Sequence, residues 1–363
     1  MPETIENKSI GSELYPCTSC GASLKYKPGT NSLHCEYCGA ESTIETQEIR
    51  EIQELDFYRH ALTVERLNTQ TKKVIDCRKC GAKSTFEENI KSSQCPYCNT
   101  PFIESDTHEE RLIQPSYLLP FKVADKELQN YLNAWLKSRL FAPKNLKKRA
   151  LLSDNLQGVY IPCWTYDART ETDYTGMRGD NYTVTVGSGK ERRTETKTRW
   201  SHRSGHISLF FDDIMIPASG MVPKMTLNKL QNWDMKNLAE ADNRFLSGFI
   251  TEKYGLNATD GYKQAKQVME PRIDRAVRQD IGGDKQQVNS KNTRFCDVKF
   301  KLILLPVYIA CYSYHNQLYH FFVNGRTGYI TGERPYSPGK IMIAVLIGIG
   351  VITLLFLWLN GDI

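Results

Sequence analysis

The chain has 363 residues, of which 40% are hydrophobic and 10% aromatic, and its mean hydropathy is −0.47. This length suits about two or three domains, and the composition excludes both a wholly disordered chain and a membrane protein with many spans. The formal net charge of +6 permits contact with nucleic acid or anionic lipid but requires neither.

Eight of the eleven cysteines form four Cys-x-x-Cys pairs, which fall into two sets. In each set 14 residues separate the inner cysteines, and the second set lies 60 residues after the first. The first set is Cys17, Cys20, Cys35 and Cys38, and the second is Cys77, Cys80, Cys95 and Cys98. One such turn presents two thiolates to a metal ion, and a second turn completes a tetrahedron. The spacing therefore predicts two zinc ribbons, at 1–43 and 75–104, that bind two Zn²⁺ per chain.

The residues that follow the pairs agree with this prediction. Gly21, Gly39 and Gly81 follow three of the pairs, and Asn99 follows the fourth. These residue types tolerate the positive φ that such a turn requires. Four thiolates can also bind iron, which is the alternative metal. Because four thiolates leave no open coordination position, the metal is expected to be structural and not catalytic.

Disulfides and a redox dithiol are the alternatives to metal binding. Disulfides would require export, and the first residues, Met-Pro-Glu-Thr-Ile-Glu-Asn-Lys, contain no apolar signal stretch. A redox dithiol uses a single pair in a βαβ context. The other cysteines, Cys163, Cys296 and Cys311, lie in apolar, strand-like segments and are expected to be buried and unreactive.

Helices are predicted at three places along the chain. In the connector 44–74, apolar residues recur at helical intervals: Ile49, Ile52, Leu55, Tyr58, Leu62 and Leu67. Asp125 is expected to cap a second helix that continues to Leu140. Residues 224–281 are also expected to be helical, with a break near Gly255.

Strands are predicted in two stretches of the domain expected at 105–335. The first runs from Gly158 to Pro217 and has a turn at Gly187-Ser-Gly189. The second covers 295–332 and carries a hairpin signal at Asn324-Gly325. The expected fold class is therefore α+β, with a substantial antiparallel sheet and helices between the zinc ribbons and the C-terminus.

The segment 341–359 is apolar enough to cross a bilayer. As a helix, its 19 residues span about 28 Å, close to the thickness of the hydrocarbon core. A single C-terminal transmembrane helix, which would make the protein tail-anchored, is expected there after a linker at 336–340. Arg326, Arg334 and Lys340 precede the segment and no Lys or Arg follows it. The domain is therefore expected to face the cytoplasm, where reducing conditions also keep thiolates available for zinc.

The sequence contains no motif of a known catalytic site. Gly187-Ser-Gly-Lys190 lacks the earlier glycine of a phosphate-binding loop. His202 and His206 could lie near each other across a turn, but an exposed strand end explains them as well. No catalytic residue and no small-molecule substrate is expected. Two basic clusters, 137–149 and 190–203, suit a solvated face, anionic lipid headgroups or the phosphates of nucleic acid.

Three segments, besides the paired ribbons, carry a resemblance to a known family. They are Gly158-Val-Tyr-Ile-Pro-Cys-Trp-Thr-Tyr-Asp-Ala168, Phe245-Leu-Ser-Gly-Phe249 and Val323-Asn-Gly-Arg-Thr-Gly-Tyr-Ile-Thr-Gly-Glu-Arg-Pro335. The chain resembles bacterial membrane-anchored zinc-ribbon proteins, labelled transcription-factor-IIB-type zinc ribbon or primosomal-protein-N′-like. This resemblance implies partners of the phage-shock or band-7 (SPFH) type and a role in envelope maintenance. It implies no helicase activity, because the chain has no helicase nucleotide site.

These observations lead to one favoured function and two alternatives. The favoured function is a non-catalytic adaptor, anchored by a single pass to the cytoplasmic face of the cell (inner) membrane, that binds other membrane-associated proteins. The first alternative is a membrane-tethered protein that binds nucleic acid weakly and without sequence preference. The second is an enzyme of a type that the sequence does not disclose.

Overall fold

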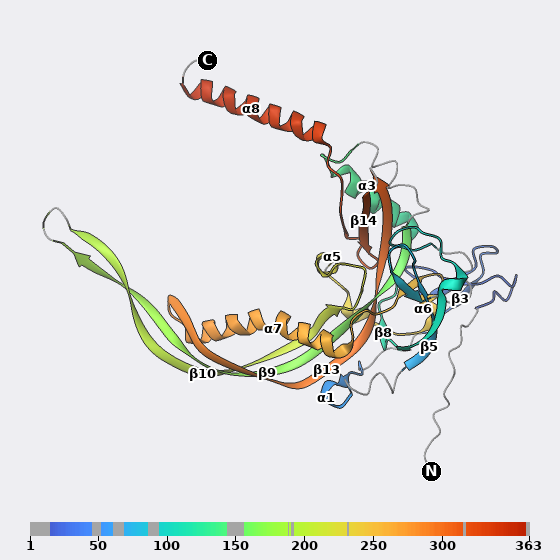
Figure 1. Ribbon diagram of the computed structural model, residues 1–363, viewed down its shortest axis with the longest axis horizontal. Helices are drawn as coiled ribbons and strands as arrows, with labels where there is room; N and C mark the ends of the chain where they lie inside the picture. Colours follow the sequence, from blue (N-terminus) through green and yellow to red (C-terminus); the bar gives the residue numbers. More distant parts are fainter. Residues whose placement is uncertain are drawn as a thin grey trace, which may run out of the picture.

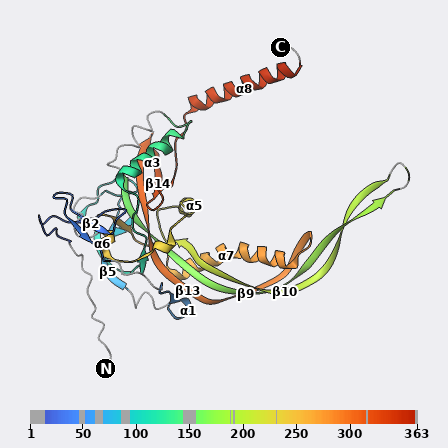
Figure 2. The same ribbon diagram turned by 180° about the vertical axis from the view of Figure 1, so that it is seen from behind.

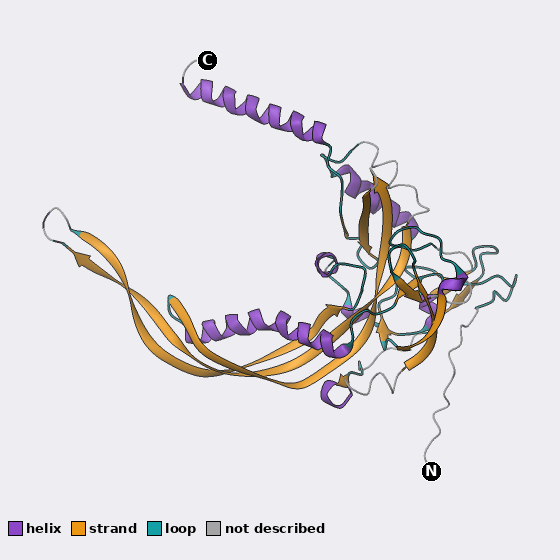
Figure 3. Cartoon of the chain, viewed as in Figure 1, coloured by secondary structure: helices purple, strands orange, loops and turns teal. Residues whose placement is uncertain are grey.

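The computed structural model describes residues 15–45, 52–60, 69–85, 94–143, 156–187, 189, 192–230, 232–314 and 317–360. Figure 3 shows a molecule made mainly of strands, with a few helices placed against them. The strands are β1 (Lys25–Tyr26), β2 (Ser32–His34), β3 (Glu41–Thr43), β4 (Leu55–Asp56), β5 (Thr69–Asp76), β6 (Lys83–Thr85), β7 (Thr107–Ile113), β8 (Tyr117–Leu118), β9 (Leu156–Val186), β10 (Arg193–Pro217), β11 (Ala239–Glu240), β12 (Ile250–Glu252), β13 (Lys285–Tyr314), β14 (Gln317–Asn324) and β15 (Ile330–Gly332). The helices are α1 (Phe57–His60), α3 (Asp125–Lys137), α5 (Lys224–Lys229), α6 (Asn243–Leu246), α7 (Ala258–Ile281) and α8 (Pro338–Asn360), with 3-10 turns η1 (Glu104–Asp106) and η4 (Met235–Asn237).

Three long strands form a curved ribbon that runs through the molecule. β9 and β13 pair antiparallel from Gly179 opposite Lys285 to Leu156 opposite Ala310. β10 pairs antiparallel with the distal part of β9. β13 begins at Lys285, opposite Gly179 of β9. Beyond this point β9 and β10 continue as a two-stranded hairpin. The hairpin projects away from the rest of the large sheet and the helices α3, α5, α6 and α7, which together we call the body (Figures 1 and 2). This part of β9 is rich in Thr, Val and Tyr, residue types that favour extended strands.

The shorter strands complete a large mixed sheet. β12 pairs parallel with β9 and β8 pairs parallel with β13, whereas the other described pairs are antiparallel. β6, β5 and β7 follow β12, while β14 and β15 follow β13 on the other side. β1, β2 and β3 form a separate three-stranded sheet. The expected α+β class with a substantial, mainly antiparallel sheet is therefore confirmed.

Helix α7 covers the concave face of the curved ribbon (Figure 1). Its buried residues recur every three or four positions, so that one stripe of the helix faces the sheet. The stripe packs against Trp164 and Tyr166 of β9 and Phe300 of β13. Gly261 allows this close approach, because a Cβ there would lie 2.3 Å from the hydroxyl oxygen of Tyr166.

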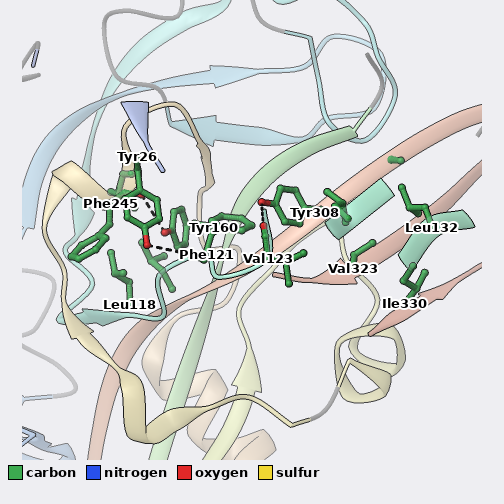
Figure 4. Close-up of a cluster of buried hydrophobic side chains, with 14 of the residues drawn as sticks. Tyr26, Leu118, Phe121, Val123, Leu132, Tyr160, Phe245, Tyr308, Val323 and Ile330 are labelled. Atoms are coloured by element: carbon green, nitrogen blue, oxygen red, sulfur yellow. Dashed lines mark hydrogen bonds between the residues drawn. The ribbon is translucent and has the colours of Figure 1, made fainter. Parts of the chain in front are cut away.

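A second core lies at the other end of β9 and β13 (Figure 4). The ring of Phe121 stacks on that of Phe249, with centroids 4.3 Å apart, and also contacts Tyr160 and Tyr308. The buried tyrosine hydroxyl of Tyr308 donates a hydrogen bond of 2.7 Å to the carbonyl of Val123. Tyr160 and Tyr308 thus bury their rings while their hydroxyls donate to backbone carbonyls.

Helix α8 projects away from the rest of the chain in both views (Figures 1 and 2). Its stretch Pro338–Leu357 has a mean hydropathy of 2.6, and none of it is buried against the protein. The helix is therefore long and apolar enough to cross a membrane. It begins at Pro338, so the expected linker at 336–340 is helical in its second half, and the extended segment before the helix is 333–337.

The prediction of a helix in the connector 44–74 is wrong for the residues that the structure describes. Residues 52–56 are extended and end in β4, α1 is a single turn, and the segment from Thr69 onward is β5. The apolar residues were spaced as on one helical stripe, but they pack in different places. Ile52 contacts the cluster around Cys163, whereas Leu55 contacts the cluster around Trp164. Residues 46–51 and 61–68 lie outside the described part.

Residues 224–281 are only partly helical, which corrects a second prediction. α7 confirms the C-terminal part, but the stretch between α5 and α7 contains η4, β11, α6 and β12. Its apolar residues again belong to separate clusters, with Leu238 in one, Phe245 in another and Ile250 in a third. Helix α3 is confirmed, although it ends at Lys137 before Leu140, and its N-cap residue is Ala124 instead of Asp125.

Candidate metal centres

The eight cysteines expected to bind metal lie in two groups of four. Within each group, the Sγ atoms all lie within 4.8 Å of one another. The first group consists of Cys17, Cys20, Cys35 and Cys38, and the second of Cys77, Cys80, Cys95 and Cys98. Short hairpins position them: the turn between β2 and β3 holds one pair of the first group, and the turn between β5 and β6 holds one pair of the second.

All four Cys-x-x-Cys turns share one backbone geometry. In the first turn, the N–H of Gly21 donates to the carbonyl of Cys17 (2.8 Å), and the N–H of Cys17 donates to the carbonyl of Ala22 (2.7 Å). The same two bonds recur in the other three turns. The residue after each pair has a positive φ: 76° at Gly21 and Gly39, 75° at Gly81 and 56° at Asn99. The positive φ predicted from the residue types is thus confirmed at every turn.

The distances between sulfur atoms fit a shared metal ion. The Sγ atoms of four pairs are 3.5 Å apart: Cys17 and Cys38, Cys20 and Cys35, Cys77 and Cys98, Cys80 and Cys95. A disulfide bond would place the sulfur atoms about 2.05 Å apart, and all of these cysteines are unbridged. Four ligands about 2.3 Å from a tetrahedral ion lie about 3.8 Å from one another. Each group could therefore hold one metal ion.

The thiols within each group lie in different electrostatic environments: the pKa is lowered at Cys17 and Cys98 and raised at Cys20 and Cys95. Backbone N–H groups of Ser19 and Cys20 hydrogen-bond to Cys17 and lower its pKa to about 6. Burial instead raises the pKa of Cys95 well above its usual range. A bound dication would supply the positive charge that keeps all four thiolates of a group ionised. The buried second group in particular needs that charge.

The first group is attached to the body by a small set of contacts. The N–H of Tyr26 donates to the carbonyl of Ser247 (3.0 Å), and the hydroxyl of Ser247 donates to the carbonyl of Leu24 (2.7 Å). The ring of Tyr26 lies edge-on to that of Phe245 with centroids 5.1 Å apart, and its hydroxyl donates to the carbonyl of Phe121 (Figure 4). The small sheet is thus docked onto the body without joining the large sheet.

The second group is built into the large sheet. Asn99 Nδ2 donates to the carbonyl of Cys311 (3.2 Å), and Nε2 of His320 lies 2.6 Å from the carbonyl oxygen of Tyr97. β5 pairs with β7, and β6 pairs with β12. The strand pairing therefore does not separate a ribbon at 75–104 from a domain at 105–335. A hairpin as short as β5–β6 leaves the outer edge of each strand unpaired unless other strands cover it. Here β7 and β12 of the larger domain pair with those edges.

A buried carboxylate also joins this group to β12. Glu252 accepts hydrogen bonds from the hydroxyl of Tyr97 (2.6 Å), the hydroxyl of Ser219 (2.8 Å) and the N–H of Gly220 (2.9 Å). Burial raises the pKa of Glu252, and these donors oppose the rise. A cavity of about 290 Å³, lined in part by Tyr97 and Met221, opens beside Cys80 and Cys98. That cavity leaves Cys80 partly accessible, whereas the other three cysteines are buried.

None of the remaining candidate residues belongs to a group of possible metal ligands in the described part of the chain. Cys163 and Cys311 are buried, as expected, and Cys296 is half-buried. His202 and His206 lie four residues apart on β10, about 13 Å at the rise of a strand, so they do not meet across a turn. His206 instead lies between Asp173 (2.7 Å) and Glu171 (2.8 Å), whose carboxylates raise its pKa.

The two basic clusters differ in what the structure describes. Residues 193–203 lie along the largely exposed first part of β10, and those up to Trp200 belong to the projecting hairpin. In the other cluster, 137–143 is described, whereas 144–149 lies outside the described residues.

The sequence analysis missed one buried cluster of charges. Lys301, which is 3% exposed, donates to Glu54 (2.5 Å) and to Asp213 (2.7 Å). Asp167 lies beside them and accepts a hydrogen bond of 2.8 Å from the N–H of Asp213. Asp213 has a φ of 48° at a bulge in β10. The available signal was Lys301 itself, a charged residue within the apolar run of β13.

Comparison with known proteins adds one distant relative and no family. No protein-family model matches the chain, and no solved structure matches it. Over 330 residues, the chain is 26% identical to a protein of Bacillus subtilis (strain 168) named "Uncharacterized protein YdjG". The match covers 90% of this chain and 91% of that protein. The likeness therefore extends over nearly the full length of both proteins, and the relative's name assigns no activity.

Proposed function

We propose that this protein is a membrane-anchored adaptor, in which zinc stabilises the body and the projecting hairpin binds a membrane-associated protein. One observation carries the proposal: an apolar helix without protein cover, α8, is attached to a body that extends a long hairpin away from its core (Figure 1). A protein held at a membrane by one end can reach neighbouring proteins with such a hairpin.

Zinc is the metal that best suits the two cysteine groups. Tetrahedral sites made of four thiolates, arranged as two Cys-x-x-Cys turns, are typical of structural zinc. Iron can occupy the same ligands, but it would give the purified protein strong visible absorption. Metal analysis of anaerobically purified full-length protein is expected to find about two equivalents of zinc. Clearly fewer equivalents, or iron in their place, would contradict this assignment.

The hairpin offers a surface suited to a protein partner. We call residues 180–187 and 192–200 the arm. Beyond Gly179, β9 pairs with no described strand except β10, and Asp284 accepts a hydrogen bond from the N–H of Asn181 (2.7 Å). From Tyr182 onward, the outer edge of β9 therefore offers its backbone groups to an added strand. Tyr182 and Trp200 are exposed, and the guanidinium of Arg199 lies 5.5 Å from the ring centre of Tyr182. An acidic, strand-forming segment of a partner would complement these features.

The partner class and the location follow from other arguments. Partners of the phage-shock or band-7 type, and a role in envelope maintenance, come from the family resemblance. Placement at the cytoplasmic face of the inner membrane comes from Arg326, Arg334 and Lys340 before α8. Protease added to sealed inside-out vesicles, at a dose high enough to digest the folded body, should therefore remove the body. Protection there, with cleavage in right-side-out vesicles, would reverse the topology and contradict the adaptor proposal.

The adaptor proposal is tested by shortening the arm. In one variant, residues 181–198 are replaced by an Asn-Gly turn, which leaves the part of β9 that pairs with β13 intact. Full-length protein crosslinked in its native membrane is expected to retain a membrane protein in stoichiometric amount. The arm variant should lose that protein and keep its metal. No stoichiometric partner, or a partner that the arm variant still binds, would overturn the proposal.

The exposed Trp200 and the basic residues of the arm favour nucleic acid as the second candidate partner. Such a surface can bind phosphates and stack on bases, but that binding is weak and falls steeply with salt. Fluorescence anisotropy with unrelated DNA and RNA sequences separates the two candidates. Sub-micromolar, sequence-selective binding at physiological salt would replace the adaptor proposal.

A further inference from the structure

We infer that the base of α8 is built to contact the headgroup layer of an anionic bilayer. The surface concerned, which we call the collar, consists of Arg139, Leu140, Phe141, Arg334, Tyr336 and Lys340. The inference rests on the proposed membrane anchoring by α8, and it adds which part of the folded body lies on the membrane. Figures 1 and 2 both place the end of α3 beside the start of α8.

Hydrogen bonds tie the loop after α3 to the first turn of α8. The N–H of Ser337 donates to the carbonyl of Phe141 (2.8 Å). The amino group of Lys340 donates to the carbonyls of Leu140 (3.0 Å) and Ala142 (2.6 Å). The loop is thus held at the level where α8 leaves the body. Any bilayer that takes up α8 meets this loop at its surface.

The apolar side chains of the collar are exposed next to an apolar helix. Leu140 is 76% exposed, Phe141 38% and Tyr336 57%. Ile341 and Met342 of α8 are exposed as well, so that the apolar surface continues from the loop onto the helix. Apolar patches that continue onto an uncovered helix mark an interaction surface. Tyrosine beside a membrane-spanning helix is typical of the interface between lipid and water.

The charges of the collar are all positive. The guanidinium of Arg139 lies 4.9 Å from the ring centre of Trp135, and that of Arg334 lies 5.2 Å from the ring centre of Tyr336. Among the described residues, neither arginine nor Lys340 forms an ion pair with a carboxylate. Basic groups at the point where a membrane helix leaves the bilayer attract anionic headgroups. Long basic side chains can reach the phosphates while their methylene stems stay in the apolar layer. Charge and apolar exposure thus point to the same partner, an anionic lipid surface.

Photocrosslinking of the full-length protein tests the inference. The photoreactive residue p-benzoylphenylalanine is introduced at position 141, and the protein is reconstituted into vesicles of phosphatidylcholine and phosphatidylglycerol. Two reference proteins carry the same residue in place of Met342 in α8 or of Phe210, which is exposed on β10. Lipid adducts are measured by mass spectrometry. Adducts are expected at 141 and 342 and not at 210.

The dependence on charge gives the second measurement. The adduct yield at 141 should fall severalfold in vesicles of phosphatidylcholine alone, and also in the double variant Arg139→Gln, Arg334→Gln. The yield at 342 should not change. The double variant Arg275→Gln, Arg278→Gln, at exposed positions on α7, is the matched control and should behave as the unmodified protein. The lipid comparison needs no variant, so it holds even if the collar substitutions disturb folding.

The outcomes separate this inference from the anchoring on which it rests. Adducts at 342 with none at 141 would overturn the collar and leave the anchoring by α8 intact. Adducts at neither position would overturn both. An equal yield at 141 in the two lipid compositions would show apolar contact without recognition of anionic headgroups, and would overturn the inference as stated.

Discussion

Asp167 is a residue whose ionised form the fold opposes. It is buried beside Glu54 and Asp213, and among the described residues Lys301 donates to those two carboxylates and not to Asp167. Burial, together with the neighbouring carboxylate of Glu54, raises the pKa of Asp167 to about 7 from its ordinary value of 3.8. Three carboxylates around one ammonium thus share too little positive charge for all of them to ionise easily at neutral pH.

Asp167→Asn should therefore stabilise the protein at neutral pH. The folded pKa lies above the unfolded one, so the folded state binds more protons between about pH 4 and pH 7, and stability falls as the pH rises through that range. Asparagine keeps the acceptor for the N–H of Asp213 and removes this slope. Thermal unfolding of the detergent-solubilised protein, measured from about pH 5.5 to avoid protonation of the metal-binding thiolates, checks the prediction.

Asp212→Asn is the control for this substitution, because Asp212 is the neighbour of Asp213 but has an exposed side chain. The control should retain the pH dependence of the unmodified protein. A slope that persists in Asp167→Asn would show that Asp167 titrates normally in the folded state.

At the scale of elements, a single hydroxyl joins the loop of the second cysteine group to β12. Tyr97 lies between Cys95 and Cys98, and its hydroxyl donates to the buried carboxylate of Glu252. The loop 219–221 donates to the same carboxylate from the other side. Glu252 thus holds two loops that are far apart in the sequence against the large sheet.

Tyr97→Phe should loosen this junction. The substitution keeps the ring but leaves a buried carboxylate with one donor fewer, which costs about 1–3 kcal/mol of the free energy of unfolding. Denaturant unfolding of the detergent-solubilised protein measures this loss. Tyr37→Phe, at a side chain that is 84% exposed, should have no such effect. Equal stability of the two variants would mean that the carboxylate is satisfied without Tyr97.

At the scale of the whole molecule, the two cysteine groups differ in how they are integrated. The first lies in a small sheet that is docked onto the body, and the second lies among strands of the large sheet. Structural zinc contributes folding energy of order 10 kcal/mol in small modules. Loss of the metal should therefore have local consequences at the first group and wider ones at the second.

Cys35→Ser and Cys95→Ser form a matched pair that tests this difference. In hydrogen exchange of the detergent-solubilised protein, Cys35→Ser should lose protection in β1–β3 and keep it in β6, β12 and β13. Cys95→Ser should lose protection in β6 and β12 as well as around its own turn. Changes confined to the immediate turn in both variants would contradict the integration of the second group and restore two independent ribbons.

The proposed anchoring by α8 predicts that removal of this helix releases the body from the membrane. The body has its own cores, and α8 contacts it mainly through the loop 140–142 at its base. A chain that ends at Pro335 is expected to remain soluble without detergent and to resist limited proteolysis, whereas the full chain requires detergent. An insoluble or readily digested product would place part of the body's stability in the membrane segment.

The sequence by itself determined the features that depend on local chemistry. Both four-cysteine sets and the positive φ at Gly21, Gly39, Gly81 and Asn99 follow from residue type and spacing, because a metal-binding turn is a local structure. The strand pattern of β9, β10 and β13 and the apolar length of α8 are equally local.

Only the tertiary structure decided where apolar residues without a continuous pattern would pack. Ile52 and Leu55 are spaced in the sequence as on one face of a helix, and so are Leu238 and Phe245, but each pair divides between two different cores. Contacts between residues distant in sequence therefore outweigh the helical periodicity of these segments. The same holds for the buried charges. Lys301 forms ion pairs with Glu54 and Asp213, and Asp167 lies beside these carboxylates. The three acids come from three other segments, so these electrostatic interactions form only once the strands have paired. The collar likewise forms because the loop after α3 and the start of α8, almost 200 residues apart, are joined by hydrogen bonds.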